Sequence, residues 1–67
     1  MRISYNKLWK MLIDKNMKKS DLKEKTGISS ASLAKLGKGD NITTDVLLRI
    51  CEVMECRIED ILETVRD

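Results

Sequence analysis

Apolar residues recur at helical spacing along this 67-residue chain, and that recurrence restricts its fold more than any other feature. Three segments carry the spacing i, i+3, i+4, i+7, which places apolar side chains on one face of a helix. The three sets are Tyr5, Leu8, Trp9 and Leu12; Leu47, Ile50, Cys51 and Met54; and Ile58, Ile61, Leu62 and Val65. No window alternates strictly enough, or is β-branched enough, to predict a sheet. We therefore predict an all-α fold of five short helices, over residues 5–16, 18–26, 30–37, 44–55 and 58–65.

Residues that favour helix ends separate these segments. Gly27 suits the left-handed position that follows a helix, and Ser29 and Thr43 are good N-caps for the helices after them. We place Ile3 in a short extended arm and residues 37–41 in a turn rich in glycine and Asp/Asn. The short turn that begins at Gly27 lets the helix after it cross the helix before it steeply and project into a groove.

The charge of the chain is distributed unevenly. Residues 1–39 carry ten Lys and Arg against three acids, a net charge of +7, whereas residues 40–67 carry three against eight, a net charge of −5. A basic half of this kind indicates a surface that faces a polyanion. Chance clustering of solvated surface charges is the alternative interpretation.

The residue inventory argues against several classes of protein. A chain of this length forms one domain, here residues 1–67, and buries only about 60% of its unfolded surface, which rarely encloses a catalytic cavity. It has no His, no nucleophile elbow and no phosphate loop of the GxxxxGKS/T kind, so we expect no enzyme. No apolar run approaches the roughly 18 residues of a membrane span. We expect a cytoplasmic protein without cofactor, metal, membrane contact or evident small-molecule effector.

Four residues that could carry other chemistry have plain structural interpretations. We expect Trp9 to pack on the core stripe of the first helix, with the Tyr5 hydroxyl one turn earlier near solvent. Cys51 lies on an apolar stripe and is expected to be a small buried residue, whereas Cys56 lies at a helix end. Two cysteines without His are too few for a zinc site, and without secretory context they indicate a reducing compartment.

The two-helix unit over about residues 18–37, with Leu22, Ile28, Leu33 and Leu36 as its apolar contacts, resembles the helix-turn-helix of the Cro/CI-type (XRE) family. The resemblance covers nearly the whole chain, since "LLRICEVM" (47–54) and "RIEDIL" (57–62) also look like this family's five-helix, lambda-repressor-like domain. The "SYNKLW" opening is most similar to short stand-alone regulators, and the chain resembles small regulators attached to glycopeptide-resistance operons. The resemblance implies a transcriptional regulator that binds double-stranded DNA.

The resemblance also implies three groups of DNA-contacting residues. In this family the start of the second helix contacts phosphates, the exposed face of the third helix reads base edges in the major groove, and residues after that helix contact the backbone. In this chain the groups are Lys18, Lys19 and Ser20; Ser30, Ala31, Ser32 and Lys35, preceded by the cap Ser29; and Lys38 and Asn41. Solvated surface residues are the alternative for the lysines and serines, and a cap alone is the alternative for Ser29.

Three departures from the family pattern predict modest sequence selectivity. The third helix lacks the Gln or Arg that makes bidentate contacts to a base, each worth about 1–3 kcal/mol of discrimination. Lys23 stands where the two helices touch and the family has Ala, and Gly37 is expected to end the third helix early. Lysine contacts to phosphate should therefore dominate affinity.

Family members dimerise so that two reading helices meet successive major grooves about 34 Å apart, and we expect a homodimer. The candidate interface consists of apolar residues off the main stripes, with burial in the monomer core as the alternative for each: Ile42, Val46, Leu48, Val53 and Val65. A different function on the same fold is a protein-interaction module, such as an antitoxin, anti-repressor or heterodimer partner. The missing Gln and Arg favour that alternative, and the retained lysines argue against it.

Overall fold

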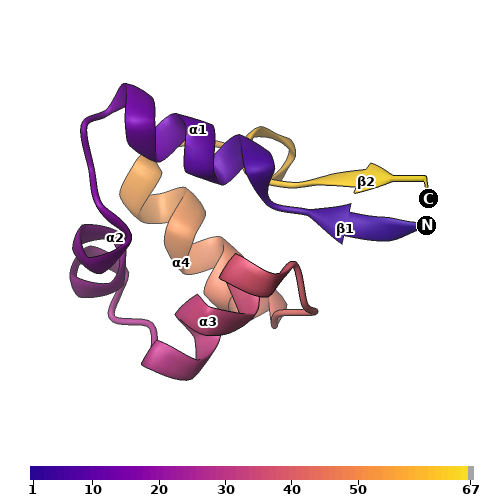
Figure 1. Cartoon of the computed structure of the whole chain (residues 1–67). Coiled ribbons are helices and arrows are strands. Elements are labelled where there is room, and N and C mark those ends of the chain that lie inside the picture. Colours follow the sequence, from indigo (N-terminus) through magenta and orange to yellow (C-terminus); the bar gives the residue numbers. More distant parts are fainter. Residues whose placement is uncertain (67) are drawn as a thin grey trace.

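The computed structural model describes residues 1–66. The elements in chain order are β1 (Arg2–Ser4), α1 (Asn6–Asp14), α2 (Lys19–Thr26), α3 (Ser30–Lys38), α4 (Thr44–Met54), the 3-10 turn η1 (Ile58–Asp60) and β2 (Glu63–Val65). The four α-helices are grouped together, and the two strands lie side by side where they project from the helices (Figure 1). No helix within residues 1–66 is long and apolar enough to cross a membrane.

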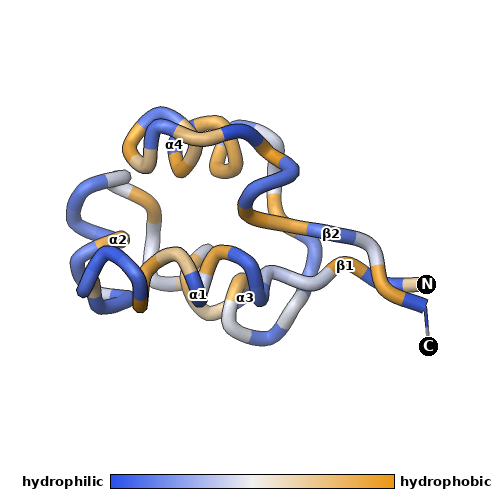
Figure 2. The backbone as a smooth tube through the Cα atoms, turned by 90° about the horizontal axis from the view of Figure 1, so that it is seen from above, coloured by the Kyte–Doolittle hydropathy of each residue, from blue (hydrophilic) through white to orange (hydrophobic). Residues whose placement is uncertain are grey.

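The core lies between the helices and is built from the apolar stripes. Leu8 and Leu12 of α1 and Leu47, Ile50 and Met54 of α4 belong to one cluster of buried side chains. Hydrophobic stretches alternate with hydrophilic ones along α1 and α4, as expected for helices with one buried face (Figure 2). Burial of each such side chain contributes about 1.5–3 kcal/mol, so this small core depends on few residues.

The predicted fifth helix over residues 58–65 is not confirmed, and the all-α description needs correction. Residues 58–60 form one 3-10 turn, and Glu63–Val65 pairs antiparallel with Arg2–Ser4 in the register Ile3↔Thr64. An eight-residue helix is marginal by itself, whereas β-branched Thr64 and Val65 favour an extended backbone. The extended arm predicted around Ile3 is therefore a paired strand.

The helix ends follow the predicted caps with one correction. Gly27 is left-handed with φ 72°, and the hydroxyls of Ser29 and Thr43 accept hydrogen bonds from the N–H groups of Ser32 and Val46. Gly37 does not end α3, which continues to Lys38. Gly39 takes the left-handed conformation instead, with φ 75°. The turn before α4 therefore begins two residues later than predicted.

Tyr5 ties the start of α1 to the turn between α3 and α4. Its side chain is only 2% exposed, and its hydroxyl donates a 2.9 Å hydrogen bond to the backbone carbonyl of Asp40. We expected the Tyr5 hydroxyl to lie near solvent, but it instead binds a backbone carbonyl 35 residues away in the sequence. Burial, and then the nearby Asp40 carboxylate, raise the pKa of the Tyr5 hydroxyl.

Candidate nucleic-acid interface

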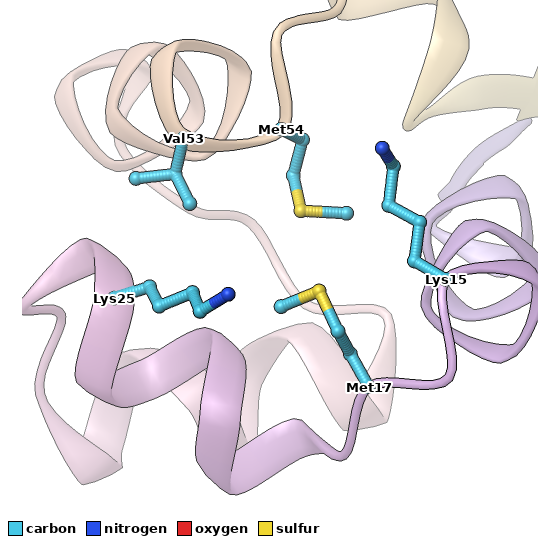
Figure 3. A pocket seen from close by; sticks show the side chains of 5 residues that line it. All are labelled: Lys15, Met17, Lys25, Val53 and Met54. Carbon is cyan, nitrogen blue, oxygen red and sulfur yellow. The ribbon is translucent and has the colours of Figure 1, made fainter.

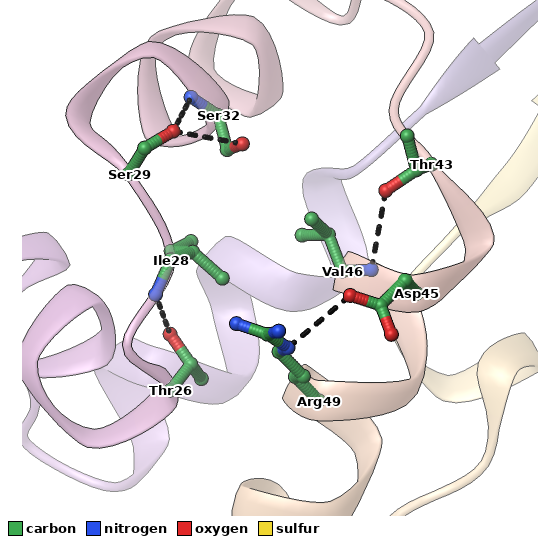
Figure 4. A network of polar contacts seen from close by, with 8 residues as sticks. All are labelled: Thr26, Ile28, Ser29, Ser32, Thr43, Asp45, Val46 and Arg49. Atoms are coloured by element: carbon green, nitrogen blue, oxygen red, sulfur yellow. Dashed lines mark hydrogen bonds and ion pairs between the residues drawn. The ribbon is translucent and has the colours of Figure 1, made fainter.

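The turn between α2 and α3 is held by side-chain hydrogen bonds as well as by glycine. The Thr26 hydroxyl donates to the Leu22 carbonyl at 2.7 Å. It also accepts from the Ile28 N–H at 3.4 Å (Figure 4). Leu22 and Ile28 are both buried, so the turn is also packed against the core. Sequence reasoning missed Thr26, although a threonine directly before the left-handed Gly27 was the available signal. These contacts fix the direction in which α3 leaves the turn.

The first turn of α3 presents small polar side chains. The Ser29 hydroxyl accepts from the Ser32 N–H and donates to the Ser32 hydroxyl oxygen, each at 3.1 Å. Because Ser32 is the acceptor in that second bond, its own hydroxyl proton remains able to donate elsewhere. Ser30 and Ala31 are exposed beside it. This end of α3 can therefore offer donors, acceptors and a methyl group to a partner.

The start of α2 combines a structural acid with exposed lysines. Asp21 accepts a 2.9 Å hydrogen bond from the backbone N–H of Lys18, which fixes the first turn of the helix. The Lys19 ammonium lies 4.5 Å from the centre of the Trp9 ring, a cation–π contact that sequence reasoning did not foresee. Ser20 is exposed next to it. Trp9 therefore packs against the core, as predicted, and also offers its ring face to the Lys19 ammonium.

The remaining predicted contact residues lie along the end of α3 and the turn that follows it. Lys35 and Lys38 are exposed in the last part of α3, where a helix favours positive charge. Asn41 is exposed in the connection to α4. Of the ten residues predicted to contact DNA, nine are exposed and Ser32 is half-buried, so none of them is fully buried in the core.

The lysines keep their charge available to a partner. Within residues 1–66, the two ion pairs observed are Arg49 with Asp45 at 3.3 Å and Arg57 with Glu59 at 3.4 Å. Neither pair involves a lysine, and no lysine in this part of the chain forms an ion pair. Exposed cations without acidic partners are suited to binding a polyanion.

A hollow of about 280 Å³ lies between the ends of α1, α2 and α4. Lys15 and Lys25 point toward it from opposite sides, and Met17, Val53 and Met54 complete its lining (Figure 3). None of its five lining residues belongs to the predicted DNA-contacting set. Lys15 and Lys25 are therefore useful reference lysines for experiments on that set.

The fold and the exposed α2–turn–α3 unit define a helix-turn-helix protein, and the sequence profile agrees. Residues 7–67 match the profile of the Cro/C1-type HTH DNA-binding domain, and the chain belongs to that family. A solved structure, "Crystal structure of transcriptional regulator VanUg, Form II", is similar over 98% of this chain and 88% of that chain, with 52% identity and a TM-score of 0.95. No curated protein matches the chain significantly.

Proposed function

We propose that residues 1–67 act as one Cro/CI-type domain, a sequence-specific DNA-binding transcriptional regulator that places α3 in the major groove. The observation that carries the proposal is the α2–turn–α3 unit, which is anchored by buried residues yet surrounded by exposed, unpaired lysines. Family membership and the similarity to the transcriptional regulator VanUg support it.

In this proposal the reading face and the backbone contacts have separate chemistry. Ser30 and Ser32 donate to or accept from base edges, Ala31 contacts a thymine methyl group, and Lys35 reaches guanine O6 and N7. The backbone contacts come from the other exposed residues of the set, namely Lys18, Lys19, Ser20, Ser29, Lys38 and Asn41. Because the reading face has no Gln or Arg, affinity comes mostly from phosphate contacts and selectivity is modest.

We further propose that the protein binds as a homodimer through the exposed side of α4. Leu48 is 53% exposed, whereas Ile42, Val46 and Val53 are half-buried against the core, and Val65 is half-buried in β2. Leu48 is therefore the candidate with the most apolar surface left to cover. Two copies would supply two reading helices and twice the number of phosphate contacts.

A salt titration of DNA binding tests the proposed function. A labelled duplex from the region upstream of the protein's own gene is compared with a scrambled duplex of equal length. We expect tighter binding to the native duplex and an affinity that falls steeply with salt. Equal affinities would contradict sequence-specific regulation. Absence of binding to either duplex at low salt would contradict the proposal and favour the protein-interaction module.

A further inference from the structure

We infer that Cys51 and Cys56 form a modification site, at which the two thiols close to a reversible disulfide within one chain. Cys51 lies in the last turn of α4, and Cys56 lies two residues beyond the end of that helix. Both side chains are half-buried and pack against the hydrophobic core. The inference stands apart from the proposed DNA-binding function, because neither residue belongs to α2, α3 or the turn between them.

The backbone folds back at Glu55 and brings Cys56 against Cys51. The N–H of Cys56 donates a 3.1 Å hydrogen bond to the carbonyl oxygen of Cys51, and the N–H of Glu55 donates to the same oxygen. This bond from beyond the helix to its last turn is typical of the Schellman motif, in which the side chains of the same two residues often touch. Here both of those side chains are thiols. Burial first, and then the neighbouring Cys51 thiol, raise the pKa of Cys56, so the two thiols are close enough to interact.

The turn between the two cysteines has a strained backbone. Glu55 adopts φ 53° and ψ 53°, a left-handed conformation that is unfavourable for a residue with a long side chain. The other non-glycine residue with positive φ within residues 1–66 is Asn16, and asparagine tolerates this conformation better. A covalent bond between Cys51 and Cys56 would hold the turn closed. We therefore expect the oxidised protein to be more stable than the reduced protein.

A low-molecular-weight disulfide, such as oxidised glutathione, is the oxidant in this reaction. The Cys51 thiol loses its proton and attacks one glutathione sulfur, so a protein–glutathione bond forms, the glutathione disulfide bond breaks, and the leaving thiolate takes up a proton. Cys56 then attacks the Cys51 sulfur in the same way, and the second glutathione leaves. The protein gives up two protons and two electrons, and two molecules of reduced glutathione form. We assign the first attack to Cys51 because burial disfavours the thiolate of Cys56.

Peptide mass spectrometry tests the disulfide on the folded, full-length protein after incubation in mixtures of reduced and oxidised glutathione. Trypsin cleaves after Arg49 and Arg57, so the peptide 50–57 carries both cysteines. An internal disulfide makes this peptide lighter by two hydrogen atoms, a glutathione adduct makes it heavier, and a bond between two protein copies joins two such peptides. We expect the internal disulfide to predominate. Predominance of adducts or of joined peptides would overturn the inference.

The same titration in urea distinguishes a site built by the fold from two cysteines that are only near each other in the sequence. At a given glutathione mixture, the ratio of disulfide to dithiol should be at least about tenfold higher in the folded protein than in the unfolded chain. By linkage, oxidation should raise the melting temperature by about 5 °C or more. Equal ratios in the two states, or a melting temperature that oxidation leaves unchanged or lowers, would overturn the inference.

Two matched single substitutions test the order of attack. Cys56→Ala keeps Cys51 and should accumulate the glutathione adduct, because no second thiol is present to release it. Cys51→Ala should form its adduct more slowly at the same pH, since the remaining thiol is the one with the raised pKa. Thermal unfolding shows that each variant is folded under the assay conditions. Equal rates, or a faster reaction of Cys51→Ala, would overturn the assigned order.

Discussion

At the scale of single residues, Cys56 illustrates how the fold sets chemical reactivity. Both cysteines are free and half-buried near the end of α4. Burial first, and then the neighbouring Cys51 and Asp60, together raise the pKa of the Cys56 thiol from 9.0 to about 11, although Lys15 acts in the opposite direction. Because the thiolate is the nucleophile, a raised pKa makes the thiol less reactive at neutral pH.

We therefore predict that iodoacetamide alkylates Cys56 slowly. Peptide mass spectrometry measures the rate of alkylation at a series of pH values between 7 and 11. At pH 8 the thiolate fraction, and hence the rate, should be about a hundredfold below that of a free thiol with a pKa of 9.0. The rate should still be rising at pH 10. A rate that reaches its plateau below pH 9 would contradict the raised pKa.

Ser29 allows a second prediction at the residue scale, because its hydroxyl accepts from the Ser32 N–H at the start of α3. Ser29→Ala should lower the free energy of unfolding by about 0.5–2 kcal/mol, measured by urea denaturation. Ser30→Ala is the matched control, since Ser30 is exposed inside the helix and alanine is a good helix former. Equal stability of the two variants would show that the cap contributes nothing.

At the scale of elements, the Tyr5 hydroxyl joins the start of α1 to the turn before α4 through the Asp40 backbone carbonyl. Tyr5→Phe should reduce the free energy of unfolding by about 0.5–1.5 kcal/mol, because a partly buried hydrogen bond is lost. Asp40→Ala keeps the accepting carbonyl and should cost less. Thermal or urea unfolding compares the two, and a larger loss for Asp40→Ala than for Tyr5→Phe would contradict this account.

The elements also show how much of the fold the sequence could predict. The stripes of α1 and α4 and the caps Ser29 and Thr43 are local patterns, so they were readable without the structure. The strand Glu63–Val65 could not be predicted in this way, since its partner Arg2–Ser4 lies some sixty residues away in the sequence. The apolar residues around it also have the spacing that is typical of a helix.

The candidate site could also be predicted only in part. Its residues could be named from the helix-turn-helix resemblance, and their contacts with DNA stay a prediction. The contacts that support the site could not be named, because they join different elements. The Lys19 ammonium over the Trp9 ring and the Tyr5 bond to Asp40 both depend on tertiary packing that no local spacing encodes.

At the scale of the whole molecule, the exposed side of α4 leads to a prediction about assembly. Leu48→Glu should convert the proposed homodimer to a monomer in sedimentation experiments while changing folding stability by no more than about 0.5 kcal/mol, because Leu48 is exposed. Ile13→Glu is the matched control, since Ile13 is exposed on α1, outside the proposed interface. A wild-type protein that is monomeric at all concentrations, or equal effects of the two substitutions, would contradict dimerisation through α4.

The central claim is that DNA contacts Lys19 at the start of α2 and Lys38 at the end of α3, and matched lysine pairs test it most directly. The double variants Lys19→Ala/Lys38→Ala and Lys15→Ala/Lys25→Ala both lower the net charge from +2 to 0, but on different parts of the surface. The measurement is the slope of log affinity against log salt for one duplex. For the first pair we predict a slope that is shallower by roughly 0.9 per lost phosphate contact, which is about two units for each protomer and nearly four for the proposed dimer, and an unchanged slope for the second pair. Equal slopes for the two variants would contradict the proposed interface.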